Sequence, residues 1–196
     1  LSIFYIDNKH ELSLDKLDKI KPRYIFFPHW NWKVDSEIYQ QYECIVFHTA
    51  PLPYGRGGSP IQNLILKGYK QSPVCALRMN ETLDSGPIYS KKEVSLQGNI
   101  DQIFRRIAVN IEEMIISICK NNPKPVSQKG LPYIFKRLSY KDNELSDLLS
   151  LSELYDRIRM VDGKDYDSSY INFGKYKIEF SDAEIKDNQI LAKVKI

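Results

Sequence analysis

Short apolar runs alternate with amphipathic stretches through the first two-thirds of the chain. Residues 2–6, 24–27 and 44–47 are continuous apolar runs of strand length, as expected for strands that are covered on both faces of a parallel sheet. Between these runs, residues 13–20 and 35–42 carry apolar positions at helical spacing. The strand–helix–strand alternation predicts an α/β architecture.

The alternation continues to residue 119. Ser59 and Pro60 predict the start of a helix that ends before Gly68. Residues 74–79 and 88–96 are typical of strands, and residues 100–119 predict the longest helix of the chain. That helix is indicated by one stripe of apolar side chains at helical spacing: Ile103, Ile107, Ile111, Met114, Ile115 and Ile118.

Residues 121–125 (NNPKP) break this pattern and mark the best candidate boundary. Beyond a short helix at 151–159, the tail alternates apolar and polar residues between turn signals, which predicts a small antiparallel β unit. We therefore expect a catalytic core over 1–122, a linker over 123–137 and a C-terminal helix plus β subdomain over 138–196.

Composition is that of an ordinary globular chain. The 196 residues are 42% hydrophobic, 27% charged and carry a net charge of +3. No run of Lys and Arg forms a basic stripe, so we expect an anionic small molecule rather than nucleic acid as the partner. No apolar run approaches the ~18 residues that a membrane helix needs. Cys44, Cys75 and Cys119 lack metal-type spacing, which indicates reduced thiols in a cytoplasmic protein without a metal site.

Residues 47–86 hold the densest group of special residues. His48 directly follows a buried-looking strand, and open parallel sheets bind ligands beyond the carboxyl ends of their strands. A histidine at that place can act as acid or base near neutral pH, although a lone histidine is more often structural. Asp84 lies in an LDSGP turn after the next strand, where a carboxylate could orient the imidazole.

Two further groups belong to the same predicted edge. The loop 51–58 contains two prolines and three glycines around Arg56, which would let its backbone approach a ligand closely while the guanidinium stays available. Residues 29–32 (HWNW) follow the strand at 24–27. Indole rings can stack on a flat heterocycle, and a packing role for one of the two Trp stays open.

The segments HTAPLPYGRGGSPIQNLI, from His48, and LRMNETLDSGPIY, around Asp84, resemble the signature of the formyltransferase family. The shared features are a His, a Leu-Pro, an Arg-Gly, a Pro that opens a helix and, 36 residues after the His, the Asp of an Asp-x-Gly turn. The resemblance covers residues 24–119 well and extends loosely to the tail. It implies an abbreviated Rossmann-like parallel-sheet core with a small C-terminal antiparallel β subdomain.

The resemblance also implies the chemistry: transfer of a formyl group from 10-formyltetrahydrofolate to a primary amine, without a metal. His48 would take the amine proton or stabilise the oxyanion, and Asp84 would hold the imidazole. The candidate folate-binding residues are Trp30, Asn31, Trp32, Arg78, Met79, Asn80, Leu83 and Asp84. The candidate residues for the second substrate are Tyr54, Arg56, Gly57, Gly58, Lys136, Arg137 and Arg159, with the basic ones expected at a pyrophosphate.

The sequence departs from the family in two places. The family has Asn-x-His where this chain has Val46-Phe47-His48, so the amide that holds the oxyanion is absent. Such a donor is worth about 10²–10³ in rate, and we expect Asn31 or Gln62 to replace it. Only 23 residues precede the strand at 24–27, fewer than in relatives. Leu1 stands where a Met would begin a protein, which leaves open that residues precede it.

The acceptor amine of the family is either charged initiator tRNA or an amino sugar. A tRNA reader needs a basic channel, whereas the short tail from Lys136 mixes acidic and basic residues. The chain looks most similar to small sugar-nucleotide N-formyltransferases of pseudaminic-acid-type biosynthesis, which implies UDP-4-amino-4,6-dideoxy-N-acetyl-altrosamine as acceptor and no nucleic-acid or membrane partner. The alternatives are an enzyme like methionyl-tRNA formyltransferase and a non-catalytic folate- or nucleotide-binding relative. Formation of a homodimer stays open.

Overall fold

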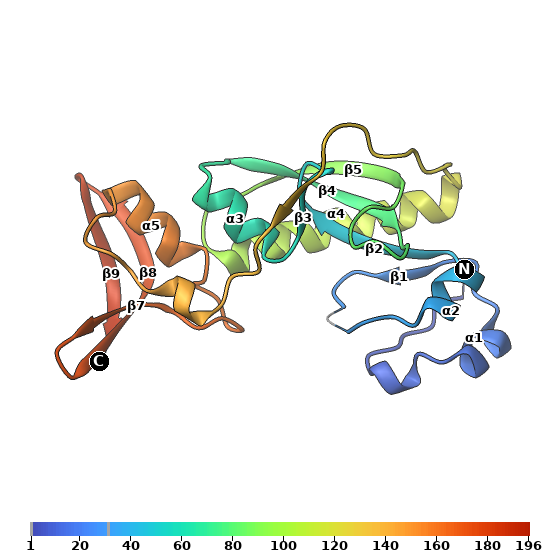
Figure 1. Cartoon of the computed structure of the whole chain (residues 1–196), viewed down its shortest axis with the longest axis horizontal. Helices are drawn as coiled ribbons and strands as arrows, with labels where there is room; N and C mark the ends of the chain where they lie inside the picture. The colour runs from blue at the N-terminus through green and yellow to red at the C-terminus, as the bar shows by residue number, and fades with distance from the viewer. Residues whose placement is uncertain (1, 31) are drawn as a thin grey trace.

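The computed structural model of the chain describes residues 2–30 and 32–196. Its helices are α1 (Leu14–Ile20), α2 (Ser36–Gln41), α3 (Pro60–Leu66), α4 (Ile100–Asn121) and α5 (Leu151–Arg159), with 3₁₀ turns at Lys9–Glu11 and Tyr140–Asn143. Its strands are β1 (Ile25–Phe27), β2 (Cys44–Thr49), β3 (Tyr54–Gly57), β4 (Gln71–Arg78), β5 (Ile88–Ser95), β6 (Tyr133–Phe135), β7 (Ser169–Phe173), β8 (Tyr176–Lys186) and β9 (Gln189–Lys195). Figure 1 shows an elongated molecule with α1 and α2 at one end and β7–β9 at the other.

Four strands form the central sheet in the order β1-β2-β4-β5. The expected fold class is confirmed: an α/β core with Rossmann-like parallel pairing of β1 with β2, and a C-terminal antiparallel sheet. The expectation that the strands after β2 are also parallel is wrong, since β4 and β5 run antiparallel to their neighbours. β4 begins at the end of the sheet where β2 ends, so the chain between them, with β3 and the seven-residue α3, does not cross back over the sheet as a parallel pair requires.

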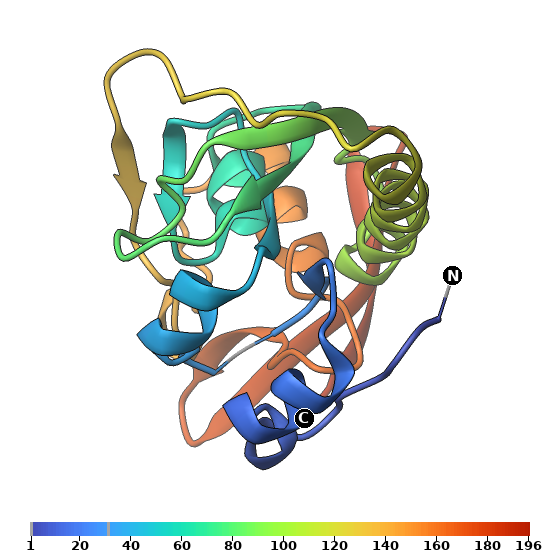
Figure 2. The ribbon, with the colours of Figure 1, turned by 90° about the vertical axis from the view of Figure 1, so that its right-hand side faces the viewer.

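Helix α4 covers one face of the central sheet, which Figure 2 shows with the helix seen end-on. It begins at Asn99, whose side chain forms a capping box with Gln102. The predicted apolar stripe lies inward, with Ile103 and Ile118 fully buried against residues of β2, β4 and β5. Burial of this stripe is the main reason that the helix forms where the sequence predicts it.

A smaller apolar cluster lies under α1 and α2, around Leu17, Phe27 and Ile38. The strand predicted at residues 2–6 is not formed, and this segment leaves its apolar side chains largely exposed, including Tyr5 at 86%. In the described part of the chain, β1 pairs only with β2. An apolar run becomes a strand only against a partner, and the segment 2–6 has none there.

The segment after α4 folds back across the central sheet. It bridges to β5 between Ile88 and Val126 and then pairs, as β6, in parallel with β3. Figures 1 and 2 show this segment as an arch that leaves the end of α4 and descends beside β3. The β3–β6 sheet is not predicted by the sequence, because β3 is half glycine and too short to show a pattern.

The last third of the chain forms α5 and the predicted antiparallel sheet β7-β8-β9. The predicted turns at Gly174 and at Asp187-Asn188 all have positive φ. After α5, Met160 and Val161 enter the main apolar cluster together with residues of β2 and α4. The C-terminal region therefore shares its core with the central sheet.

Candidate active site

His48 and Asp84 lie together at the carboxyl end of β2. His48 is 8% exposed, and its Nδ1 is 3.4 Å from Asp84 Oδ2. The other ring nitrogen, Nε2, is 2.7 Å from the carbonyl oxygen of Gly55. Both ring nitrogens therefore face acceptors, which can hold a ring that has gained a proton.

Asp84 reaches His48 from the loop between β4 and β5. Its φ is 52°, a left-handed conformation that Asp tolerates better than most residues. Two residues on, a Cβ at Gly86 would lie 1.7 Å from the carbonyl oxygen of Arg78, so any other residue would force the loop away from β4. The conformation of the Asp-Ser-Gly turn therefore depends on the left-handed φ of Asp84 and on the missing side chain of Gly86.

Side chain and backbone contacts from β3 and from the segment after α4 hold this loop. The N–H of Gly57 donates to Asp84 Oδ2 at 2.9 Å. Gln128 Nε2 donates to the carbonyls of Asp84 and Gly86 at 2.8 and 2.9 Å, while its Oε1 accepts from Arg56 at 2.8 Å. The sequence analysis missed Gln128, since it stands in a linker without a motif and acts through a long-range contact.

Two predicted folate residues, Trp30 and Met79, pack together with Val46 on the apolar cluster of α1 and α2. The Trp30 ring lies edge-on to Trp32 at 4.8 Å and to Phe27 at 5.6 Å. Trp30 Nε1 is buried and has no hydrogen-bond partner among the described residues. A buried donor without a partner is costly, and a polar ring ligand at this place would satisfy it.

The other predicted folate residues lie on the loop after β4 or beside it. Arg78 pairs with Glu43 at 3.0 Å, and Asn80 accepts a hydrogen bond from within the loop. Leu83 is 70% exposed, so this loop presents an apolar side chain next to Asp84. Asn31 lies outside the described residues.

Gln62, one of the two residues expected to replace the missing amide, is not among the contacts of His48. It is 5% exposed in the first turn of α3, whereas the partners of His48 in the described part of the chain are Gly55 and Asp84. Burial raises the pKa of the Tyr166 hydroxyl, and the neighbouring Gln62 side chain lowers that pKa in part. The expectation that Gln62 serves the formyl position is therefore not supported by its contacts.

Four predicted substrate residues lie in or next to β3 and β6. Tyr54 belongs to a stack of tyrosines. Lys136 forms an exposed ion pair with Asp142 at 2.8 Å. Gly58 lies so close to Arg137 that a Cβ would meet the Arg137 Cβ at 2.5 Å. Lys136 and Arg137 are exposed, whereas Tyr54 and Gly58 are half-buried.

Arg159 has a structural role and not the predicted one. It is 3% exposed, its Nε donates to Asp156 at 2.6 Å, and its Nη1 donates to the carbonyls of Leu96 and Gly98. These bonds tie α5 to the loop before α4. A guanidinium that is saturated and buried in this way is not free to bind a pyrophosphate.

The two buried thiols, Cys44 and Cys75, are poor nucleophiles. Burial raises the pKa of Cys44 to about 12 and that of Cys75 to about 11, so both stay protonated near neutral pH. Within residues 2–30 and 32–196, no group of three His, Cys, Asp or Glu side chains could hold a metal ion. None of the helices of the described chain is long and apolar enough to cross a membrane.

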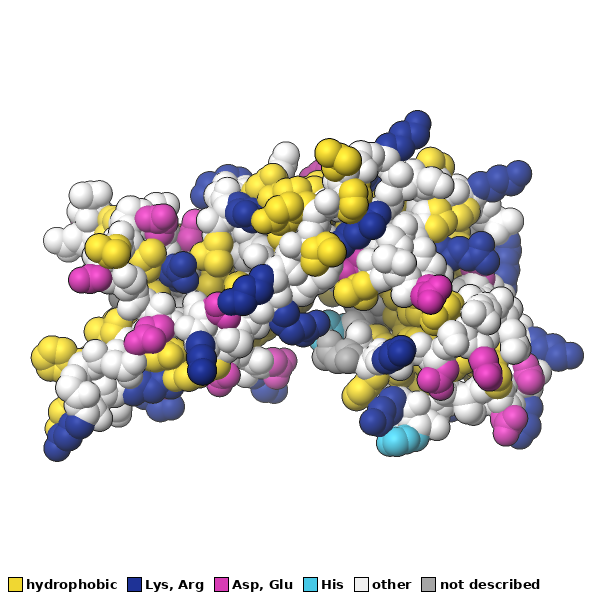
Figure 3. Space-filling view, viewed as in Figure 1, with side chains coloured by type: hydrophobic (Ala, Val, Ile, Leu, Met, Phe, Trp, Pro, Cys, Tyr) yellow, Lys and Arg dark blue, Asp and Glu magenta, His cyan; other side chains and the backbone are white. Residues whose placement is uncertain are grey.

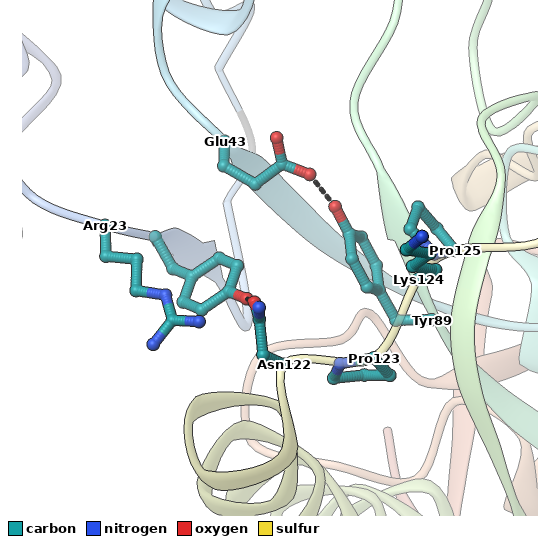
Figure 4. A pocket seen from close by; sticks show the side chains of 8 residues that line it. Arg23, Glu43, Tyr89, Asn122, Pro123, Lys124 and Pro125 are labelled. Atoms are coloured by element: carbon teal, nitrogen blue, oxygen red, sulfur yellow. Dashed lines mark hydrogen bonds between the residues drawn. The ribbon is translucent and has the colours of Figure 1, made fainter.

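A pocket of about 300 Å³ lies at the amino end of β2 (Figure 4). Four of its side chains are paired with one another: Tyr89 donates to Glu43, and Tyr24 donates to Asn122 at 2.5 Å. Because a strand rises about 3.3 Å per residue, Glu43 is roughly 16 Å from His48. The pocket is therefore separate from the catalytic pair, and its hydrogen bonds join β1 and β5 to neighbouring segments.

Comparisons with known proteins agree with this geometry. Residues 140–196 match the family model "Methionyl-tRNA formyltransferase, C-terminal domain". The structure of methionyl-tRNA formyltransferase from Clostridium thermocellum is 40% identical and covers 97% of this chain and 84% of that chain, with a TM-score of 0.93. The chain belongs to the formyltransferase family. Formyltransferases of this family use 10-formyltetrahydrofolate, as the resemblance implied.

The curated relatives are longer than this formyltransferase chain. Methionyl-tRNA formyltransferase from Campylobacter lari is 32% identical over 153 residues, which are 76% of this chain and 50% of that protein. The chain thus spans about half the length of the curated relatives that it matches. A 4-N formyltransferase from Francisella tularensis shares the fold, at 18% identity and a TM-score of 0.66, covering 87% of this chain and 75% of that chain.

These relatives overturn the expected acceptor. The prediction of a nucleotide-linked amino sugar, of pseudaminic acid biosynthesis and of no nucleic-acid partner is wrong, because the strongly similar proteins are methionyl-tRNA formyltransferases. The prediction depended on the short tail and its mixed charge. The tail nevertheless matches the C-terminal domain of that enzyme family, and the basic residues are scattered in sequence, so no stripe is visible before the chain folds.

Proposed function

We propose that this formyltransferase transfers the formyl group of 10-formyltetrahydrofolate to the amino group of methionine carried by initiator tRNA. The observation that carries the proposal is the contact between His48 and Asp84, held by the backbone of β3, in a chain with this similarity to methionyl-tRNA formyltransferases. We expect the enzyme to act in the cytoplasm, where initiator tRNA is charged and used.

The catalytic pair would move one proton during the transfer. Bound 10-formyltetrahydrofolate supplies an electrophilic carbon, and the amine loses a proton as its nitrogen bonds to that carbon. His48 would take this proton, and Asp84, 3.4 Å from Nδ1, would stabilise the charged ring. His48 would then return the proton to the departing tetrahydrofolate nitrogen and end in its starting state. Gly57 keeps Asp84 in place throughout, through its N–H.

The residues around Trp30 fit a folate ring. The indole N–H is buried without a protein partner, and Val46 and Met79 offer apolar surface on the same cluster. We propose that Trp30 donates this hydrogen bond to the pterin and that the exposed Trp32 covers its edge. Tetrahydrofolate should then quench the tryptophan emission, since the chain has only two Trp. Unchanged emission at saturation would contradict this placement.

Val46 favours a second candidate function. Its side chain packs between two apolar clusters and offers no hydrogen bond to a developing oxyanion. Loss of such a donor costs about 10²–10³ in rate. A relative that binds folate and tRNA without transferring the formyl group is therefore the alternative, and only the rate of transfer separates the two.

The test is formyl transfer by the purified chain. Charged initiator tRNA is incubated with enzyme and 10-formyltetrahydrofolate, and formylmethionine is measured by mass spectrometry after release of the amino acid. Uncharged tRNA and methionine-charged elongator tRNA serve as controls. The proposal predicts formylmethionine from charged initiator tRNA, above the rate without enzyme. Folate-dependent quenching of Trp emission without any formylmethionine would favour the binding-only candidate.

A further inference from the structure

Charge is segregated along the chain in a way that only the fold makes visible. Residues 44–80 and 114–141 contain no Asp or Glu, whereas the remaining residues carry all 25 of them. The basic residues of the two segments are Arg56, Lys67, Lys70 and Arg78 in the first and Lys120, Lys124, Lys129, Lys136, Arg137 and Lys141 in the second. The two segments meet where β3 pairs with β6, so the β3–β6 region is positively charged.

Tyrosine rings lie on this basic region. Tyr54 of β3 stacks on Tyr133 of β6 with ring centroids 4.9 Å apart and planes 21° apart, and on Tyr69 at 6.3 Å and 26°. Lys67 Nζ is 5.5 Å from the centre of the Tyr133 ring. We call Tyr54, Tyr69, Tyr133 and Lys67 the tyrosine platform. Tyr133 is 46% exposed and Tyr69 is 39% exposed, so ring surface is open to a ligand.

The tyrosine platform is adjacent in sequence to the residues that contact His48 and Asp84. Tyr54 precedes Gly55, whose carbonyl meets His48, and Gly57 of the same strand donates to Asp84. Figure 3 shows hydrophobic side chains gathered over the β3–β6 region, with Lys and Arg side chains beside them. Lys67, Lys70, Lys129 and Arg137 form no ion pair within the described part of the chain.

We propose that the tyrosine platform stacks unpaired bases of the acceptor RNA, next to the aminoacylated end that must reach His48; this inference rests on the proposed function. Aromatic rings beside lysines are the surface that single-stranded nucleic acids recognise, because every base has a face that can stack and every phosphate is negative. Stacking of this kind tolerates any base sequence. The lack of acidic residues in both segments is the charge complementarity that such a strand needs.

The binding test uses a short single-stranded RNA with 2-aminopurine near its 3′ end, because this base loses fluorescence when it stacks. Wild-type protein should quench the probe. Tyr133→Ala should weaken binding by at least about fivefold, while Tyr133→Phe, which keeps the ring, should bind like the wild type. Tyr69→Ala gives a second variant on the other side of Tyr54. Lys67→Gln should reduce the salt dependence of binding.

Tyr176→Ala is the matched control. Tyr176 is 50% exposed and has Lys175 Nζ at 5.2 Å over its ring, but no aromatic stack beside it. This variant should bind the probe like the wild type. Equal losses in Tyr176→Ala and Tyr133→Ala would show that any exposed tyrosine has this effect, and would overturn the platform.

The outcomes separate this inference from the proposed function. With active enzyme, Tyr133→Ala should raise the KM for charged tRNA and leave kcat unchanged. The wild type could form no formylmethionine and still quench the probe, with weaker quenching by Tyr133→Ala. That result would support the tyrosine platform and contradict the proposed function. If Tyr133→Ala and Tyr69→Ala both bind the probe like the wild type, the platform is wrong even in an active formyltransferase. If Tyr133→Ala dissociates a dimer and binds the probe like the wild type, the tyrosine platform is an interface between two copies of the chain and not an RNA-binding surface.

Discussion

Two buried pairs of ionisable side chains in this molecule are held in different ways. Asp156 and Arg159 lie three residues apart on α5, 2.6 Å from each other, and the other bonds of Arg159 go to backbone carbonyls. His48 and Asp84 come from different elements and approach only to 3.4 Å. The first pair is saturated by the protein. The second pair has a longer contact, and the exposed Leu83 of the loop lies beside it.

The two pairs also differ in the backbone conformation that positions them. The α5 pair is formed by ordinary helical spacing. The catalytic pair depends on a left-handed φ at Asp84, on the absence of a side chain at Gly86 and on the bridge from Gln128. Unfavourable local conformation that the surroundings enforce is typical of functional sites. The comparison supports the proposal that the His48–Asp84 pair serves chemistry and the Asp156–Arg159 pair serves stability.

Replacement of Asp84 should give the largest effect. We expect Asp84→Ala and Asp84→Asn to lower kcat for formylation by about 10²–10⁴, because the protonated His48 loses its carboxylate. The double variant with His48→Ala should be little worse than either single variant, since the two residues act as one unit. Circular dichroism serves as the control for folding. A multiplicative loss in the double variant would contradict a shared role.

Arg159→Met should show the opposite behaviour. It leaves Asp156 buried without a partner, which costs about 3–5 kcal/mol of stability, while kcat per folded molecule stays at the wild-type value. Urea unfolding and a titration of active sites measure the two quantities. Arg157→Met, two residues earlier on α5 and less buried, is the matched control and should lose less stability. A fall in kcat with unchanged stability would give Arg159 a role in substrate binding.

Replacement of Gln128 tests whether the segment after α4 positions the loop that carries Asp84. Gln128→Ala removes the donor to the carbonyls of Asp84 and Gly86, and we expect kcat to fall by about 10-fold to 10²-fold as the carboxylate moves. Gln128→Glu keeps the acceptor for Arg56 but loses the donor, so it should be at least as slow. Folate binding should change little. If Gln128→Glu were fully active, the bridge would have no positioning role.

The exposed pair between Lys136 and Asp142 should give the smallest effect. Hydrogen bonds from Lys136 and from Ser139 lower the pKa of Asp142 from 3.8 to about 2. Its stabilising contribution is therefore present above pH 3.8 and is lost as the pH falls towards 2. Asp142→Asn should cost at most about 1 kcal/mol at pH 7, and the difference from wild type should shrink below pH 4. If the difference in unfolding free energy between wild type and Asp142→Asn grew as the pH fell, the lowered pKa of Asp142 would be contradicted.

The sequence predicted the elements that local signals define. The stripe on α4, the bounds of α5 and the turns of the tail all follow from side-chain spacing, helix caps and glycine. The proximity of His48 and Asp84 was also predicted, but through a parallel strand that does not exist. The contact is made because the loop after β4 folds back, with Gly86 against Arg78.

The missed features all depend on contacts between distant segments. Gln128 reaches Asp84 across 44 residues, and β6 pairs with β3 across more than 70. Neither segment has a local sequence pattern from which its partner in the fold could be predicted. The basic region was missed for the same reason, since its residues are dispersed over two segments that only the fold brings together. Arg159 was misassigned because a sequence does not show which guanidinium is buried.

Single-turnover formyl transfer to charged initiator tRNA, measured for wild type, His48→Ala and Arg159→Met together, tests the central claim most directly. The account predicts that His48→Ala is slower than wild type by at least about 10² with an unchanged urea midpoint. It predicts that Arg159→Met is less stable and transfers at the wild-type rate when folded. Wild-type transfer by His48→Ala would contradict the assignment of the catalytic pair, however well the protein binds folate or tRNA.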